Sequence, residues 1–140
     1  MTRVDFYIVE KAREDRLGIV CRLAQKAYDA GQRAHLHVAD AAQAERLDTL
    51  LWTFHQGSFI PHAIAGTPEA DAAPLVIDHA GEPAEPYQLL FNLADDVPSF
   101  CGRFERVIEV IGTTEEEVRD GRARYRYYRD RGYPLTDTKV

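Results

Sequence analysis

The fold is decided by the stretch VDFYIVEKAREDRLGIVCRLAQKAYDAGQRAHLHV, residues 4–38. Its first and last segments, Val4–Val9 (VDFYIV) and Ala34–Val38 (AHLHV), are short apolar runs rich in β-forming residues, which predict two strands. Between them Asp15 is a candidate N-cap and Gly31 a candidate stop, so the intervening residues predict a helix. A strand, a helix and a second strand in this order are typical of an α/β protein with parallel strands.

The rest of the chain continues this alternation. Helices are expected over Asp40–Leu51 and Thr114–Arg131, the second ending at Gly132. The segment Ala65–Pro86 is rich in small residues, proline and glycine, so it is expected to be mainly loop around one apolar run. The remaining strand candidates are Leu75–Ile77, Tyr87–Leu93 and Arg106–Ile111. The pattern predicts an α/β fold with a mostly parallel sheet flanked by helices, and 140 residues suit one domain, residues 1–140.

Composition and charge narrow the classes of function. The formal net charge is −6, whereas a protein whose main role is to grip nucleic-acid phosphates is usually basic, so direct nucleic-acid binding is not expected. Cys21 and Cys101 form no CxxC pair, which points to a reducing compartment. No signal peptide or membrane-spanning stretch is recognised, so a cytoplasmic protein is the expectation.

The motifs do not indicate a cofactor or an active site. After the first predicted strand the chain reads Glu10–Arg13 (EKAR), without the glycines that let a backbone approach a pyrophosphate. Cys101 has no context typical of a nucleophile and is expected to be a buried structural thiol. His35 and His37 project to one face of a strand, but their spacing matches no standard zinc pattern. A small metal-dependent α/β hydrolase is therefore kept only as an alternative.

The last predicted helix carries the most informative pattern. It begins with three glutamates and ends among arginines, a polarity that complements the helix dipole. A row of arginines beside an aromatic row is suited to bind a carboxylate and an apolar side chain together. From spacing alone, a solvated arginine face remains the favoured interpretation. The core-type row is Val118, Gly121, Tyr125 and Tyr128, and the row beside it is Arg119, Arg122, Arg126 and Arg129.

A second candidate surface combines Trp52 with the segment Ser58–His62 (SFIPH). A lone tryptophan at a helix end usually packs into the core, and Phe59 with Ile60 is also compatible with a short buried strand. If these side chains are exposed, they form a natural protein-binding patch, because aromatic residues dominate interface hot spots. The sequence leaves both interpretations open.

Three strings of sequence carry a family resemblance: RLDTLLW (Arg46–Trp52), SFIPHAIAG (Ser58–Gly66) and RARYRYYRDRGYPL (Arg122–Leu135). In their order, spacing and position along the chain they resemble the chi subunit family of DNA polymerase III clamp loaders, and the likeness spans essentially the whole chain. The resemblance implies a single Rossmann-like α/β domain without nucleotide binding. It also implies a non-catalytic adaptor of the DNA replication machinery that acts by binding other proteins.

The same resemblance implies two protein contacts. One is with the acidic C-terminal tail of single-stranded DNA-binding protein (SSB), whose final phenylalanine needs a cation for its carboxylate and a pocket for its ring. The other is with the psi subunit of the clamp loader, or with a helicase that uses the same face. By position the tail-binding residues fall on Ile111, Arg122, Tyr125 and Arg126, and the psi-binding residues on Trp52 and Phe59.

One further alternative and one departure from the family pattern accompany this hypothesis. A direct binder of single-stranded DNA would stack bases on Tyr125, Tyr127 and Tyr128, although the negative net charge disfavours it. Gly112 and Gly121 stand where the family pattern suggests bulkier residues. We therefore expect a looser start of the last helix.

Overall fold

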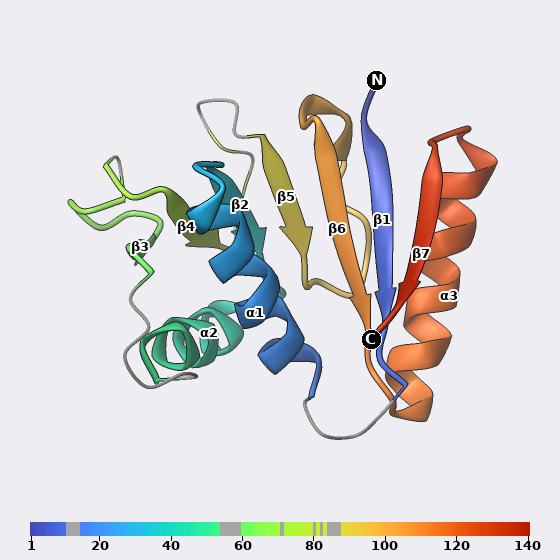
Figure 1. Ribbon diagram of the computed structural model, residues 1–140, viewed down its shortest axis with the longest axis horizontal. Coiled ribbons are helices and arrows are strands. Elements are labelled where there is room, and N and C mark those ends of the chain that lie inside the picture. The colour runs from blue at the N-terminus through green and yellow to red at the C-terminus, as the bar shows by residue number, and fades with distance from the viewer. Residues whose placement is uncertain (11–14, 54–59, 71, 80, 82, 84–87) are drawn as a thin grey trace.

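The computed structural model describes residues 1–10, 15–53, 60–70, 72–79, 81, 83 and 88–140. Over these residues the chain forms seven strands, three α-helices and a short 3-10 helix at Cys101–Arg103 (Figure 1). The helices are α1 (Arg16–Asp29), α2 (Ala41–Thr53) and α3 (Glu115–Asp130). The strands are β1 (Arg3–Ile8), β2 (Ala34–His37), β3 (His62–Ile64), β4 (Leu75–Asp78), β5 (Leu89–Asn92), β6 (Arg106–Ile111) and β7 (Leu135–Lys139).

All seven strands join one sheet in the order β3-β4-β2-β5-β6-β1-β7. Every pair of neighbours in this sheet is parallel, and β1 lies in its interior, with Val4 opposite both Val107 and Leu135. The predicted α/β class is confirmed as a Rossmann-like fold, and the sheet is more uniformly parallel than "mostly parallel" implied.

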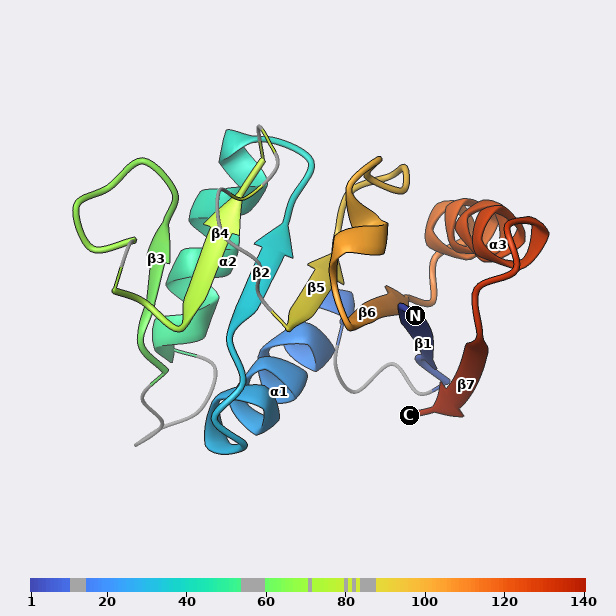
Figure 2. The same ribbon diagram turned by 90° about the horizontal axis from the view of Figure 1, so that it is seen from above.

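The helices cover both faces of the sheet, with α1 and α3 on opposite sides (Figure 2). α1 and α2 pack on one face, where Val20, Leu47 and Phe91 belong to the larger hydrophobic core. α3 packs on the other face, where Phe6 and Tyr128 belong to a second core. β1 and β7 lie beside α1 rather than behind it (Figure 1), so the α1-side face of these two strands carries polar side chains, as described below.

The sequence signals around α1 were accurate. Asp15 caps the helix, because its side chain accepts a hydrogen bond of 2.9 Å from the backbone N–H of Gly18. Gly31 follows the helix with a φ of +73°, in the left-handed region that glycine adopts without strain. The predicted apolar face is buried at Leu17, Val20, Cys21 and Ala24, while Tyr28 is half-buried.

Two strands escaped the sequence analysis. β7 was not predicted at all, because Leu135–Lys139 (LTDTK) is polar after its first residue. β7 forms because its backbone pairs with that of β1 at the edge of the sheet. Four of its five residues are exposed, so their side chains give no apolar signal. β3 begins at His62, the last residue of the segment for which a short strand was one of two interpretations.

The two histidines of β2 lie against aromatic side chains, with His35 buried and His37 half-buried. His35 is 1% exposed and lies near Phe100 and Phe104, with ring centroids 6.0 and 6.2 Å apart. His37 stacks beside it, with a centroid separation of 6.5 Å. Among the residues that the structure describes, no group of three or more His, Cys, Asp or Glu side chains is placed to hold a metal ion.

Candidate protein-binding site on helix α3

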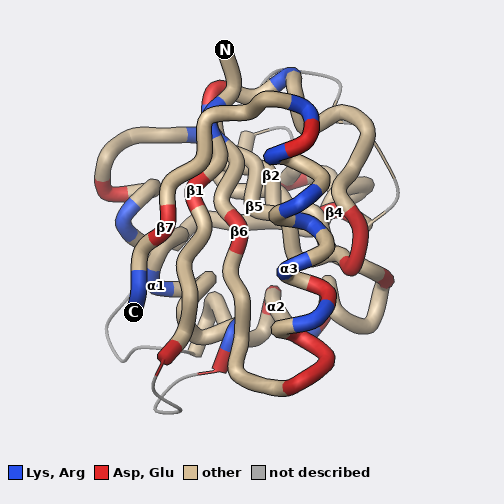
Figure 3. Tube along the Cα trace, turned by 90° about the vertical axis from the view of Figure 1, so that its right-hand side faces the viewer, with Lys and Arg blue, Asp and Glu red and all other residues tan. Residues whose placement is uncertain are grey.

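Helix α3 has a well-defined beginning. Thr114 and Glu117 form a capping box, in which the Thr114 hydroxyl accepts from the Glu117 N–H and the Glu117 carboxylate accepts from the Thr114 N–H. Acidic residues gather at this end, and basic residues follow along the helix (Figure 3). This polarity suits the helix dipole, as the sequence indicated.

The glycines near this end tighten the packing of α3, so the expectation of a looser helix start was wrong. A Cβ atom at Gly121 would lie 2.6 Å from Ile111 Cγ1, and one at Gly112 would lie 2.2 Å from the carboxylate of Glu117. Neither distance is possible in a real structure without movement. Gly121 therefore allows α3 to approach β6 closely over Ile111, whereas Gly112 leaves room for the carboxylate of the Glu117 side chain.

A buried carboxylate anchors the sheet-facing side of α3. Glu109 on β6 is fully buried and accepts hydrogen bonds of 2.8 Å from Arg124 Nε, Tyr128 Oη and Asn92 Nδ2. Burial, together with the negative charge of Glu109, raises the pKa of the Tyr128 hydroxyl, which therefore stays a donor. These bonds fix which residues of α3 face the sheet and which face solvent.

The solvent-facing side of α3 carries a hollow of about 480 Å³. It is lined by Thr113, Glu115, Val118, Arg119, Arg122 and Arg126. Half-buried Val118 supplies an apolar surface, and Arg122 and Arg126 are exposed on the same side of the helix. Glu115 stands at the acidic end, so an anion is favoured toward Arg122 and Arg126. The hollow therefore places two guanidinium groups, each able to form two hydrogen bonds with a carboxylate, beside an apolar surface.

The four residues assigned to the tail site by resemblance occupy two settings. Arg122 and Arg126 line the hollow together. Ile111 is 8% exposed beneath Gly121, and Tyr125 is half-buried with its ring centroid 5.0 Å from that of Phe6, so neither is among the lining residues. Val118 and Arg119, which do line it, were recognised in the sequence as part of the helix pattern but not assigned to the site.

The second candidate surface is described only in part. Trp52, at the end of α2, is 49% exposed, and its ring lies 4.4 Å from the ring of His62. His62 Nε2 lies 3.1 Å from Asp48 Oδ1 and its Nδ1 lies 2.7 Å from the Ile60 carbonyl oxygen, so the imidazole is fixed beside the indole. Phe59 lies outside the described residues. Of the two interpretations left open for Trp52, the exposed aromatic is the one found.

Comparison with known proteins identifies the family. The family model of the DNA polymerase III chi subunit, HolC, matches residues 1–136. The chain belongs to the DNA polymerase III chi subunit family. It is therefore an accessory subunit of DNA polymerase III, a protein of DNA replication.

Curated members of the chi family resemble the chain along most of its length. The DNA polymerase III subunit chi of Pseudomonas aeruginosa is 42% identical, with 100% of this chain and 98% of the relative covered. The Escherichia coli subunit chi is 29% identical over 84% of this chain and 80% of its own length. The Haemophilus influenzae subunit chi is 27% identical over 87% of this chain and 85% of its own length.

Solved structures share the fold of this chi family member at low identity. T4 UvsW matches with a TM-score of 0.68 at 9% identity, covering 99% of this chain and 41% of that chain. The C-terminal domain of the DEAD-box protein Dbp5 matches with a TM-score of 0.60 at 14% identity, and the match covers 99% of this chain and 90% of that chain. At these identities the likeness concerns the fold alone.

In this chi family member the side chain of Arg16 lies across the carboxyl ends of β5 and β6. In open α/β sheets, ligands commonly bind outside the carboxyl ends of the strands. Here Arg16 donates hydrogen bonds to the carbonyl oxygens of Val110 (2.8 Å), Leu93 (3.2 Å) and Asn92 (3.4 Å). Arg16 was not singled out from the sequence, because its partners are distant in the chain.

No described helix is long and apolar enough to span a membrane.

Proposed function

We propose that this chain is a replisome adaptor that holds the C-terminal tail of SSB in the α3 hollow. The observation that carries the proposal is the placement of Arg122 and Arg126 around Val118 in one hollow of about 480 Å³. Arginine forks onto a carboxylate through two parallel hydrogen bonds, so the free carboxylate of a terminal phenylalanine is a fitting ligand. The adaptor is expected in the cytoplasm and without an active site of its own.

The ring of that phenylalanine has two apolar neighbours in this proposal. Val118 lies inside the hollow, and Tyr125 follows Arg122 by three residues, which places it on the same flank of the helix. Ile111, pressed against Gly121, backs this flank from the sheet. In this proposal Ile111 and Tyr125 support Val118 from the same hydrophobic cluster without lining the hollow themselves, while Arg122 and Arg126 hold the carboxylate.

The contact acts by occupancy, so modest affinity is sufficient. SSB coats single-stranded DNA in many copies, and several weak contacts in a shared complex strengthen one another through avidity. Because the tail is acidic and the hollow is lined by exposed arginines, salt should weaken the contact. Raising sodium chloride from 50 to 300 mM is expected to lower the affinity about tenfold.

A titration tests this proposal. A peptide of the SSB C-terminus is titrated into the full chain by calorimetry and compared with the same peptide lacking its last phenylalanine. Arg122→Ala should weaken binding of the intact peptide at least about tenfold, because a charge-assisted hydrogen bond is lost. The matched control is Arg46→Ala, an exposed arginine of α2, which should leave binding unchanged. Equal affinity for both peptides and all three proteins would refute the α3 site.

We also propose that the surface around Trp52 binds a second partner, a psi subunit or a helicase. Support comes from the half-exposed indole, which His62 holds in place and which is large enough to anchor an interface. Phe59 is the second aromatic residue of this proposal. Trp52→Ala should abolish co-purification with psi while leaving SSB-peptide binding intact. If this variant still co-purified with psi, Trp52 would not be part of the contact.

A further inference from the structure

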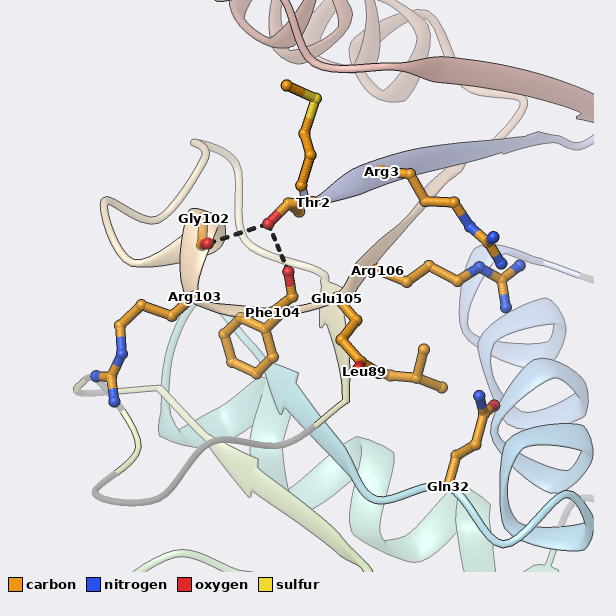
Figure 4. Close-up of a pocket in the computed structure, with 10 residues that line it drawn as sticks. Thr2, Arg3, Gln32, Leu89, Gly102, Arg103, Phe104, Glu105 and Arg106 are labelled. Atoms are coloured by element: carbon orange, nitrogen blue, oxygen red, sulfur yellow. Dashed lines mark hydrogen bonds between the residues drawn. The ribbon is translucent and has the colours of Figure 1, made fainter.

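A second basic hollow lies at the opposite end of the sheet from the start of α3. It has a volume of about 550 Å³ and opens at the amino ends of β1, β5 and β6 (Figure 4). A smaller hollow of about 210 Å³ adjoins it, because both share Gln32, Leu89 and Arg106 as lining residues. The smaller one extends along α1 toward Lys26. Neither shares a lining residue with the α3 hollow.

The chemistry of this hollow is dominated by two arginines that share one carboxylate. Arg106 Nε donates to Asp5 Oδ2, and Arg3 Nε lies 3.9 Å from the same oxygen. Thr136 donates its hydroxyl to the other oxygen of Asp5. Asp5 therefore offsets one of the two positive charges and also accepts a hydrogen bond from the uncharged Thr136 hydroxyl. Glu105, which also lines the hollow, is a second acidic group, so Asp5 and Glu105 balance Arg3 and Arg106, and Lys26 of the adjoining hollow supplies the remaining positive charge.

The donors of the hollow converge from different elements. Arg106 is held in place, because its Nη2 also donates to Tyr7 Oη at 2.8 Å. Arg3 is less constrained, with a side chain that is 63% exposed. Figure 4 shows Arg3 and Arg106 extending from the strands on one side and Gln32 pointing toward them from the opposite wall, while Arg103 points away. One guanidinium held by hydrogen bonds, one largely exposed guanidinium and an amide donor together suit a carboxylate.

We propose that this hollow, lined by Arg3, Arg106, Gln32 and Lys26, is a second docking site, which takes an acidic segment of a partner polypeptide. Charge complementarity selects the partner: the chain is acidic overall at −6, yet around the paired hollows Arg3, Arg106 and Lys26 outnumber Asp5 and Glu105. An internal acidic segment fits, because nothing in the site requires a free chain end. The site is independent of the α3 hollow proposed for the SSB tail.

Nucleic acid fits this hollow less well than a peptide. Binding of a single strand relies on aromatic rings on which bases stack. Of the two aromatic side chains that line the paired hollows, Phe104 is 3% exposed and the Tyr7 hydroxyl is engaged by Arg106. The donors are suited to carboxylates, and they offer no platform for bases.

The test uses the full chain and a defined probe. The probe is an acetylated and amidated peptide, Asp-Leu-Asp-Glu-Leu-Asp, whose blocked end cannot act as a terminal carboxylate at α3. It is titrated into the ¹⁵N-labelled protein at 50 mM salt, with a ten-residue oligo(dT) in a parallel titration. The peptide should shift the backbone amides of Arg3, Gln32 and Arg106 more than those of Arg122 and Arg126.

Charge reversal provides the matched comparison. Arg3→Glu and Lys26→Glu should each weaken peptide binding at least about tenfold, because attraction becomes repulsion at the site. Arg46→Glu makes the same change at an exposed position on α2 and should alter binding less than about twofold. The proposal is overturned if all three variants lose affinity equally, if no binding is seen at millimolar peptide, or if oligo(dT) binds this hollow more tightly.

Discussion

His35 is a buried titratable residue, 1% exposed, that lies beside two phenylalanine rings. Burial, and to a lesser degree the neighbouring His37, lowers its pKa from 6.5 to about 4, although Asp78 acts in the opposite direction. The side chain is therefore neutral in the folded protein, next to the rings of Phe100 and Phe104. Such a group makes folding sensitive to acid.

The pH dependence has a defined sign. Between pH 6.5 and 4 the unfolded chain binds a proton at His35 that the folded chain does not, so stability falls as the pH falls through this window. The free energy of unfolding should drop by about 2 kcal/mol between pH 7.5 and pH 5 through this residue. Urea denaturation at both pH values measures it. His35→Leu should lose less stability over this interval; an equal loss in both proteins would contradict the assignment.

Gly121 is the second residue whose identity is dictated by its surroundings. Because a Cβ there would meet Ile111 at 2.6 Å, Gly121→Val should push α3 away from β6 and cost about 2–3 kcal/mol of unfolding free energy. Ala123→Val introduces the same β-branched side chain at an exposed position of the same helix and should cost no more than about 0.7 kcal/mol. Denaturant unfolding compares the two. Similar losses would mean that helix propensity, rather than the close approach, dominates.

At the level of the element, α3 is oriented by the buried contacts of Glu109. Glu109→Ala removes the acceptor of Arg124, Tyr128 and Asn92 and leaves a buried guanidinium without its counter-charge. We expect the free energy of unfolding to fall by about 3–5 kcal/mol, the usual effect of removing one partner of a buried ion pair. Differential scanning calorimetry would show it as a lower Tm.

The double variant Glu109→Leu with Arg124→Met provides the control for this element. Replacing both charges by apolar side chains of similar size removes the uncompensated charge, so most of the lost stability should return. A double variant as unstable as Glu109→Ala would mean that the bonds of Glu109 to Tyr128 and Asn92 dominate the anchor.

At the level of the whole molecule, the sheet depends on its last strand to cover β1. A chain truncated after Gly132 loses the ladder between β7 and β1, the bond from Val4 N–H to the Pro134 carbonyl at 2.9 Å, and the contact of Thr136 with Asp5. With several backbone bonds lost at about 0.5–1.5 kcal/mol each, the unfolding free energy should fall by at least about 3 kcal/mol. The newly exposed edge of β1 should also promote self-association, measurable by analytical ultracentrifugation.

A conservative change in the same strand separates pairing from side-chain effects. Asp137→Asn alters an exposed residue of β7 without touching its backbone ladder and should leave stability within about 0.5 kcal/mol. If truncation and Asp137→Asn were equally mild, β7 would contribute little to the stability of the sheet.

Local patterns were sufficient to predict α1, β4, the start of α3 and the α/β class, because caps and hydrophobic periodicity depend on residues close together in the chain. The strings around Trp52 and Arg122 were likewise sufficient for the family. The inward turn of Arg124, the burial of His35 and the existence of β7 were not predictable in this way. Each depends on a partner brought near only by folding: Glu109 for Arg124, Phe100 for His35, and β1 for β7.

The same distinction holds for the two hollows. The arginine row of α3 was visible as a helical spacing, yet a solvated face and a lined hollow have the same sequence pattern, and only packing against β6 distinguishes them. The hollow at Arg3 and Arg106 had no sequence signal, since these residues are 103 positions apart and meet through parallel pairing of β1 with β6. Charge balance at a site is a property of distances in space, and these distances are set by the fold.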